Sequence, residues 1–263
     1  MILFLAGTSD ARELAILLKR SGHSLLTTVV TQNAAIELKK AGLSVYVGRL
    51  TEDDFVEKIK EQNVQAIVDA SHPFAEEAST NALNASKEAG IPYIRYERAS
   101  QSHFGKGITI VDDYVMAAEH ALRRRGVIML TTGSKTLQVF TERLLDQPDI
   151  RLIARMLPRK DNMEKCEELK LPQRDIVAIQ GPFTKEFNSA LYKQYAVTTM
   201  ITKESGKVGS VDEKVEAALE LGIEVIMIKR PKIEYKNLYS DYTDVLTHIN
   251  RVVFTDQFMD GRE

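Results

Sequence analysis

The sequence predicts an α/β fold with two Rossmann-like parallel-sheet domains and a cleft between them. Short apolar runs alternate with stretches of helical pattern along most of the 263 residues. The runs are apolar throughout, as expected of parallel strands that are covered on both faces. Small, polar, glycine-rich turns follow the runs, which is typical of loops that lead from strands into helices.

The first half contains five predicted strands in branched, apolar segments bounded by turn residues. They span residues 2–6, 25–30, 45–47, 66–70 and 93–95. A helix-like stretch follows each of them, and the clearest cover 10–19, a helix entry at 51–54, and 75–89. This alternation predicts a parallel sheet with helices on both faces.

A polar stretch without periodicity, at residues 96–107, is the best candidate for a domain boundary. Beyond it the predicted strands span 127–130, 150–155, 176–179, 198–202 and 225–228, with helices near 112–124, 184–194, 209–221 and 242–251. We therefore predict a cofactor-binding domain over 1–105 and a substrate-cleft domain over 106–263. The rhythm alone supports this division, because the halves share no sequence repeat.

Composition and charge exclude several classes of function. The net charge of −2, with basic and acidic residues interspersed, provides no basic stripe for nucleic acid. Cys166 is the single cysteine, so no internal disulfide forms, as expected of a cytoplasmic protein. No apolar run reaches membrane-spanning length, and no histidine or carboxylate spacing indicates a bound metal.

The turn after the first strand is a candidate phosphate-binding site. Gly7 permits close approach of a ligand, Thr8 and Ser9 carry hydroxyls, and the following helix offers free N–H groups. Asp10 would repel a phosphate or cap the helix, and the full G-x-G-x-x-G pattern is absent. From these residues alone, a structural turn and a phosphate cradle are equally supported.

The turn after the fourth strand carries the clearest candidate for proton transfer. His72 is the one histidine of the first half at a strand's carboxyl end, where an imidazole can donate to a ligand. Asp69 is as well explained by a structural role as by a functional one. Arg95 and Arg98 leave the fifth strand toward the predicted cleft, where they would hold acidic groups, although a solvated surface role is nearly as well supported.

Together these turns resemble the precorrin-6A reductase family of cobalamin biosynthesis. The motifs that carry the resemblance are residues 7–12, 48–50, 69–75, 131–133, 181–183, 203–206 with Gly209, 213–214, 217–218 and 230–231. Each motif is short, but their joint order and spacing are specific and cover most of the chain. Val30, Thr31 and residues 48–50 resemble the anaerobic, cobalt-precorrin-6A reductase type more closely.

The resemblance implies a two-domain reductase that uses NADH or NADPH to reduce one ring double bond of a polycarboxylate tetrapyrrole. The product would be precorrin-6B or its cobalt form, and any cobalt would arrive with the substrate. The loop at 31–34 has no Arg or Lys for a 2′-phosphate, which slightly favours NADH, with Arg49 a possible exception nearby.

The resemblance also implies roles for individual residues. The expected cofactor-binding residues are Gly7, Thr8, Ser9, Arg12, Thr31, Gly48, Arg49, Leu50, Ser71 and His72. The expected substrate-binding residues are Phe74, Arg95, Thr132, Gly133, Lys203, Ser205, Gly206 and Lys207. His72 is the expected proton donor, with water or a substrate carboxyl group as alternatives. Asp10 is expected to cap the helix while residues 7–9 face the cofactor.

Two other functions fit the sequence. A short-chain-type nicotinamide reductase would share the first turn, but the chain lacks a Tyr-x-x-x-Lys helix for polarising a carbonyl. A non-catalytic two-domain ligand-binding module would also use a cleft between sheets. Nicotinamide fluorescence on mixing with NADH or NADPH separates this module from both enzymes.

Overall fold

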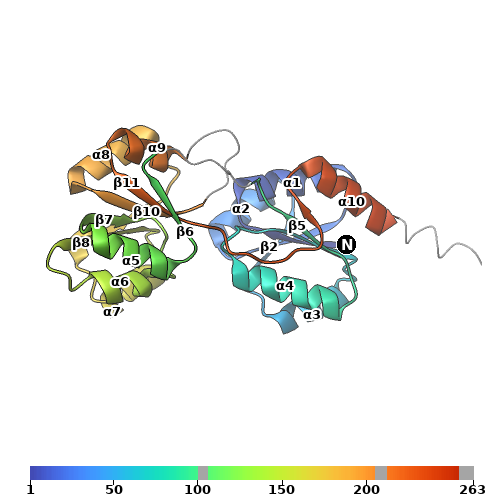
Figure 1. Cartoon of the computed structure of the whole chain (residues 1–263). Coiled ribbons are helices and arrows are strands. Elements are labelled where there is room, and N and C mark those ends of the chain that lie inside the picture. Colours follow the sequence, from blue (N-terminus) through green and yellow to red (C-terminus); the bar gives the residue numbers. More distant parts are fainter. Residues whose placement is uncertain (100–105, 205–211, 255–263) are drawn as a thin grey trace, which may run out of the picture. The chain divides into compact units, whose positions relative to one another are not determined.

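A computed structural model describes residues 1–99, 106–204 and 212–254. The chain separates into two compact units, which are Met1–Ala99 with Pro231–Glu263 (unit 1) and Ser100–Arg230 (unit 2). Each unit contains one six-stranded sheet, and every strand pair is parallel. The predicted α/β fold class with two parallel sheets is confirmed (Figure 1).

Unit 1 is built on a sheet with the strand order β12-β5-β4-β1-β2-β3. Its elements are β1 Ile2–Ala6, α1 Ser9–Arg20, β2 Leu25–Val29, α2 Gln32–Lys40, β3 Ser44–Val47, α3 Glu52–Glu61, β4 Ala66–Ala70, α4 Glu76–Glu88, β5 Tyr93–Tyr96, β12 Leu238–Tyr239 and α10 Tyr242–Phe254. Helices α1, α2 and α10 cover one face of the sheet, and α3 and α4 cover the other (Figure 1). The central strands β1 and β4 are buried from both sides, which explains their continuous apolar sequence.

Unit 2 repeats this architecture with the strand order β6-β11-β10-β7-β8-β9. Its elements are β6 Ile108–Val111, α5 Tyr114–Arg124, β7 Gly126–Leu130, α6 Leu137–Leu144, β8 Ile150–Met156, α7 Lys160–Glu168, a 3-10 turn Gln173–Asp175, β9 Ile176–Ala178, α8 Lys185–Tyr195, β10 Thr199–Lys203, α9 Glu213–Glu220 and β11 Glu224–Ile228. Helices α8 and α9 pack on one face of the sheet, where Tyr192 and Val215 join the core.

Threonines begin the helices that follow the first three strands. The side chains of Thr8, Thr31 and Thr51 each accept a hydrogen bond from a main-chain N–H in the first turn of α1, α2 and α3. Thr51 and Asp54 form a reciprocal capping box, as expected from the acidic helix entry at 51–54. These caps fix where each strand-to-helix loop ends and therefore position the loops themselves.

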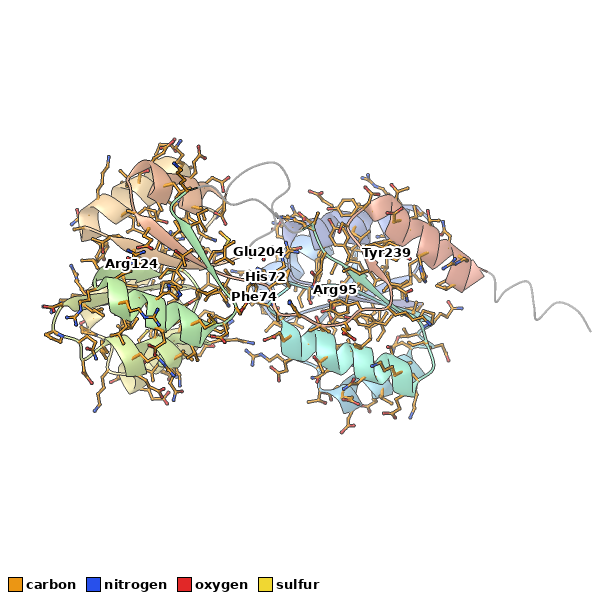
Figure 2. All side chains as sticks on the ribbon, in the orientation of Figure 1. His72, Phe74, Arg95, Arg124, Glu204 and Tyr239 are labelled. Carbon is orange, nitrogen blue, oxygen red and sulfur yellow. The ribbon has the colours of Figure 1, made fainter. Side chains whose placement is uncertain are left out.

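The C-terminal segment belongs to unit 1, which differs from the predicted domain over 106–263. After Arg230 the chain returns to the first sheet, where Leu238 pairs with Arg95 and Tyr239 with Tyr96. Tyr239, labelled in Figure 2, therefore lies in unit 1 although unit 2 precedes it in the chain. Helix α10 adds fully buried apolar side chains to the unit 1 core. A strand of two residues has too few side chains to show a strand pattern in the sequence.

Candidate functional site

The loops after β1 and β4 meet at the point where the strand order of unit 1 reverses. Strand β1 pairs with β2 on one side and with β4 on the other, so the α-helices that follow β1 and β4 leave in opposite directions. A Cβ atom on Gly7 would lie 3.0 Å from His72 N and 3.3 Å from Ser71 Cα. Glycine therefore permits the close approach of the two loops at a position where open α/β sheets bind ligands.

Thr8, and not Asp10, caps helix α1. The Thr8 Oγ1 atom accepts a hydrogen bond from Ala11 N at 3.1 Å, and the helix begins at Ser9. Asp10 lies in the first turn and forms an ion pair with Arg98. The expectation that the Asp10 carboxylate caps this helix is wrong, because the N-cap position belongs to Thr8.

Arg98 compensates the acidic charge beside the β1–α1 turn. It follows strand β5, and its Nη2 atom lies 3.4 Å from Ser9 Oγ while the guanidinium pairs with Asp10. A carboxylate in the first turn of a helix would repel an incoming phosphate, and a paired guanidinium cancels that repulsion. The turn thus combines a glycine, two hydroxyls and a neutralised first helical turn, a set of groups that fits a phosphate-bearing cofactor.

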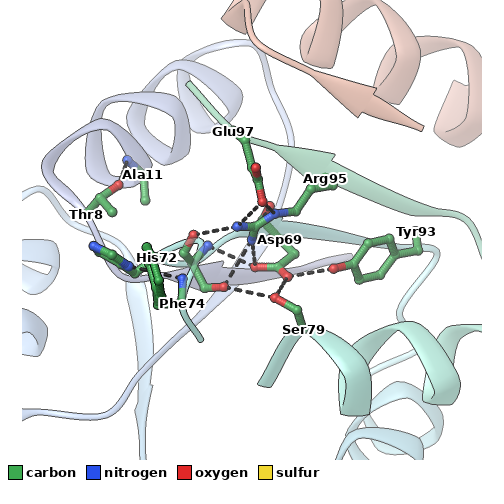
Figure 3. Close-up of polar contacts among 10 residues, drawn as sticks. Thr8, Ala11, Asp69, His72, Phe74, Ser79, Tyr93, Arg95 and Glu97 are labelled. Atoms are coloured by element: carbon green, nitrogen blue, oxygen red, sulfur yellow. Dashed lines mark hydrogen bonds and ion pairs between the residues drawn. The ribbon is translucent and has the colours of Figure 1, made fainter. Parts of the chain in front are cut away.

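Asp69 is the centre of a buried polar cluster in unit 1 (Figure 3). The side chain has no exposed surface, and its two oxygens accept four contacts. The donors are Ser71 N at 2.8 Å, Arg95 Nη1 at 2.7 Å, Ser79 Oγ at 2.7 Å and Tyr93 Oη at 2.6 Å. Burial alone would raise the pKa of Asp69, but the Arg95 charge and the hydrogen bonds outweigh burial and lower the pKa. A saturated carboxylate of this kind has a structural role.

Arg95 is the partner of Asp69 and uses all of its donors inside the protein. The guanidinium is completely buried and donates to Asp69, to the main chain and hydroxyl of Ser71, and to Glu97. The ring of Tyr235 lies 5.5 Å from its Cζ atom. The structure contradicts the expectation that Arg95 holds a substrate carboxylate, because no donor remains for a ligand and none of the side chain reaches the surface.

The segment after β4 presents His72 and Phe74 outside this cluster. His72 is exposed, and its Nδ1 atom accepts a hydrogen bond from Phe74 N at 3.2 Å. The neutral imidazole therefore carries its proton on Nε2 in this geometry, while a protonated ring would lose the contact. Ser71 is buried beside them, with Oγ 3.1 Å from Arg95 Nη1, so its hydroxyl lies inside the cluster and does not face the surface as expected of a cofactor contact.

The remaining predicted cofactor residues of unit 1 surround the ends of β1, β2 and β3. Thr31 caps α2, with Oγ1 3.3 Å from Ala34 N. Arg12 lies 3.5 Å from a carboxylate oxygen of Glu37 on α2. After β3, Gly48 N donates to Val29 O at 2.9 Å, Arg49 is exposed, and Leu50 is buried in the core. Arg49 therefore has a side chain available at the surface, whereas Leu50 contributes packing.

Unit 2 has a second reversal point, between β7 and β10, where several predicted substrate residues lie. Strand β7 pairs with β8 on one side and β10 on the other, and Thr131 N donates to Ile201 O at 2.9 Å. The buried Thr132 hydroxyl has no hydrogen-bond partner within the part of the chain that the structure describes. Gly133 has a φ of 81°, and Lys203 Nζ lies 5.4 Å from the centre of the Tyr114 ring. Ser205, Gly206 and Lys207 lie outside the described residues.

Sequence reasoning missed the residues that complete the buried cluster. These residues are Ser79 on α4, Tyr93 on β5, Glu97 directly after β5 and Tyr235 in the C-terminal return segment. The sequence did contain a signal for this cluster, since Asp69 and Arg95 are single charged residues within otherwise apolar strands. Such charges are buried only with a partner. The strand register, which sets Asp69 directly beside Arg95, makes the two charges neighbours.

The described residues contain no group of three or more His, Cys, Asp or Glu side chains arranged to hold a metal ion. None of the helices in the described ranges combines the length and hydropathy needed to cross a membrane.

Comparisons with known proteins identify similar chains of known family. Residues 1–250 match the family model described as Precorrin-6x reductase CbiJ/CobK. The chain is 65% identical to the cobalt-precorrin-6A reductase of Priestia megaterium over 94% of this chain and 96% of that one. It is 36% identical to the cobalt-precorrin-6A reductase of Salmonella typhimurium, covering 88% and 87%, and 25% identical to the precorrin-6A reductase of Rhodobacter capsulatus, covering 93% and 94%.

A solved structure described as CobK precorrin-6A reductase matches with a TM-score of 0.76 at 24% identity, over 95% of this chain and 96% of that one. At this identity the match supports the fold.

Proposed function

Since the chain belongs to the CbiJ/CobK precorrin-6x reductase family, a nicotinamide-dependent enzyme family of corrin biosynthesis, we propose that its substrate is the cobalt-containing form, cobalt-precorrin-6A. The observation that carries this proposal is the high identity to a relative named for the cobalt substrate, well above the identity to relatives named for the metal-free one. The reaction would reduce one ring double bond and yield cobalt-precorrin-6B.

The cofactor is proposed to bind at the reversal point of unit 1. Gly7 lets the loop after β4 approach the turn closely, Thr8 and Ser9 provide hydroxyls for the pyrophosphate, and Arg98 offsets the Asp10 charge. NADH is favoured over NADPH because the loop at 31–34 has no basic side chain for a 2′-phosphate. When bound, the nicotinamide supplies the hydride, and the protein supplies orientation.

His72 is proposed to contact the reacting groups. Its exposed ring follows the strand next to the cofactor turn, and its Nδ1 atom accepts a hydrogen bond from Phe74 N. In one role the imidazole would orient the nicotinamide or the substrate, and in the other it would donate a proton. Proton donation requires the protonated ring and loss of the Phe74 contact, so the two roles have different pH dependences.

Substrate carboxylates are proposed to interact with polar groups of unit 2. Lys203 at the end of β10 supplies a cation, and Thr132 with the main chain at Gly133 supplies N–H and hydroxyl groups in the neighbouring loop. The predicted contributions of Phe74, Ser205, Gly206 and Lys207, and a cytoplasmic location, remain predictions.

An anaerobic absorbance assay tests the proposal directly. Cobalt-precorrin-6A and metal-free precorrin-6A are each combined with NADH and with NADPH, and the four kcat/KM values are compared. The cobalt substrate with NADH should have the highest value. Faster turnover of metal-free precorrin-6A would overturn the substrate assignment, and a higher kcat/KM with NADPH would overturn the cofactor preference alone.

A further inference from the structure

Arg155, near the carboxyl end of β8 in unit 2, is a buried cation with little compensation. Only 8% of the Arg155 surface is exposed. Among the residues that the structure describes, one hydrogen bond engages the guanidinium, from Nη1 to Asn188 Oδ1 at 2.7 Å. The ring of Phe183 lies against it, with Cζ 4.8 Å from the ring centre. Four of its five N–H donors therefore have no acceptor in the described protein.

Other arginines on the strands show that this arrangement is unusual for the chain. The buried Arg95 pairs with two carboxylates, and Arg151, four residues before Arg155 on the same strand, has Nε 2.7 Å from an Asp175 oxygen. No carboxylate in the described residues forms an ion pair with Arg155. An uncompensated buried charge is costly, so a position that retains one is a candidate for binding an opposite charge.

The acidic residue that attracts Arg155, Asp212, is paired with Lys214. Asp212 attracts Arg155 at longer range, but its carboxylate lies 2.8 Å from Lys214 Nζ and accepts a hydrogen bond from Lys214 N. Burial lowers the pKa of Arg155 more than the attraction of Tyr192 and Asp212 raises it. The guanidinium still remains charged, because arginine does not lose its proton at physiological pH.

Two nitrogens of the Arg155 guanidinium are left for an anion. Nε and Nη2 have no hydrogen-bond acceptor among the described residues, and 8% of the residue surface remains exposed. The face of Phe183 and the amide of Asn188 fix the plane of the guanidinium. A planar guanidinium held in this way is ready for two parallel hydrogen bonds to one carboxylate.

We propose that Arg155 is an anion-binding residue that receives a carboxylate group of a ligand through Nε and Nη2. The assignment of this ligand group as a side-chain carboxylate of the tetrapyrrole rests on the proposed function. The anion site itself follows from the geometry of Arg155, Asn188 and Phe183. A phosphate has the same hydrogen-bonding chemistry, and the experiment separates the two sources.

Three variants test the site. Arg155→Gln removes the charge but keeps an amide donor for Asn188 Oδ1. Arg155→Lys keeps the charge but loses the planar guanidinium that can form two parallel hydrogen bonds. Arg151→Gln is the matched control, since it removes a paired arginine from the same strand. In steady-state assays Arg155→Gln should raise the KM for cobalt-precorrin-6A about 10- to 100-fold, with Arg155→Lys intermediate. The KM for NADH and the kcat should change less than about threefold, and Arg151→Gln should leave all three constants near the native values.

Thermal unfolding with added citrate tests the site without the reductase reaction. Citrate should raise the Tm of the native protein and of Arg151→Gln, but not that of Arg155→Gln, and the Tm of Arg155→Gln without citrate should equal or exceed the native value. A fall in Tm with unchanged citrate stabilisation would show a structural role and overturn the proposal, as would an unchanged substrate KM together with unchanged citrate stabilisation. A rise in the KM for NADH alone would assign the site to a cofactor phosphate. If Arg155→Gln loses the citrate stabilisation but the native protein does not reduce cobalt-precorrin-6A, the anion site stands and the proposed function is refuted.

Discussion

Replacing Arg95 by Met is expected to destabilise unit 1 strongly, because it removes one partner of a buried ion pair. Asp69 and Arg95 are neighbours in the register of β4 and β5, lie 2.7 Å apart and are both fully buried. Removal of the guanidinium leaves a carboxylate without a counter-charge in the core. Breaking a buried pair in this way costs about 3–5 kcal/mol of unfolding free energy.

The loss should depend on pH. In the native protein the pKa of Asp69 is lowered, so its stabilising contribution is complete above the ordinary aspartate pKa and is lost only as pH falls through the lowered value. Without Arg95, burial would raise the pKa of Asp69 above its ordinary value. The folded variant would then bind a proton that the unfolded chain has released, so its unfolding free energy should fall as pH rises between the two pKa values.

Urea unfolding at neutral and mildly acidic pH measures both effects. Two controls accompany Arg95→Met. The double variant with Asp69→Asn removes the uncompensated charge and should recover part of the loss. Arg125→Met removes an exposed ion pair to Asp149, whose side chains are 57% and 63% exposed, and should cost less than about 1 kcal/mol. A loss for Arg95→Met below about 1 kcal/mol, or one that is equal at both pH values and unrelieved by Asp69→Asn, would refute the reasoning.

Three further predictions concern the cofactor turn and the chain's return to unit 1. Arg98→Met should weaken NADH binding about 3- to 10-fold, because it leaves the Asp10 charge without its partner. The double variant with Asp10→Asn should recover the affinity. Fluorescence titration measures both Kd values, and an affinity that is not recovered would contradict the electrostatic role. His72→Ala should lower kcat with little change in the Kd for NADH, and an unchanged kcat would remove His72 from the reaction. Deletion of residues 231–263 should unfold unit 1 and abolish NADH binding, and a truncated chain with native circular dichroism and NADH affinity would show that β12 and α10 are dispensable.

The sequence predicted the repeating elements well because their apolar pattern is local. The strand at 2–6 was predicted with its observed ends, and the turns at 7–9 and 71–74 were correctly located at strand ends. Periodicity cannot reveal which strands are neighbours, so the pairing of Asp69 with Arg95 was missed and Arg95 was expected to face a ligand.

Competition between neighbouring groups explains the errors within the turn after β1. Thr8 and Asp10 are both suitable capping residues by type, and the choice depends on backbone conformation and on the arrival of Arg98 from a distant strand. Gly7 is more ambiguous than the sequence indicates. Its small size is required for contact with the β4 loop, so loss of activity in a bulky variant would report on packing as well as on the cofactor.

The placement of β12 has a consequence for synthesis of the protein on the ribosome. The residues that complete the first sheet are translated after the whole of unit 2. Unit 1 therefore acquires its last strand, β12, and its covering helix, α10, only after unit 2 has been synthesised. Unit 2 can assemble from an uninterrupted stretch of nascent chain, whereas the edge of β5 stays unpaired until its partner emerges. A message truncated after unit 2 would therefore yield a product that lacks a finished first sheet.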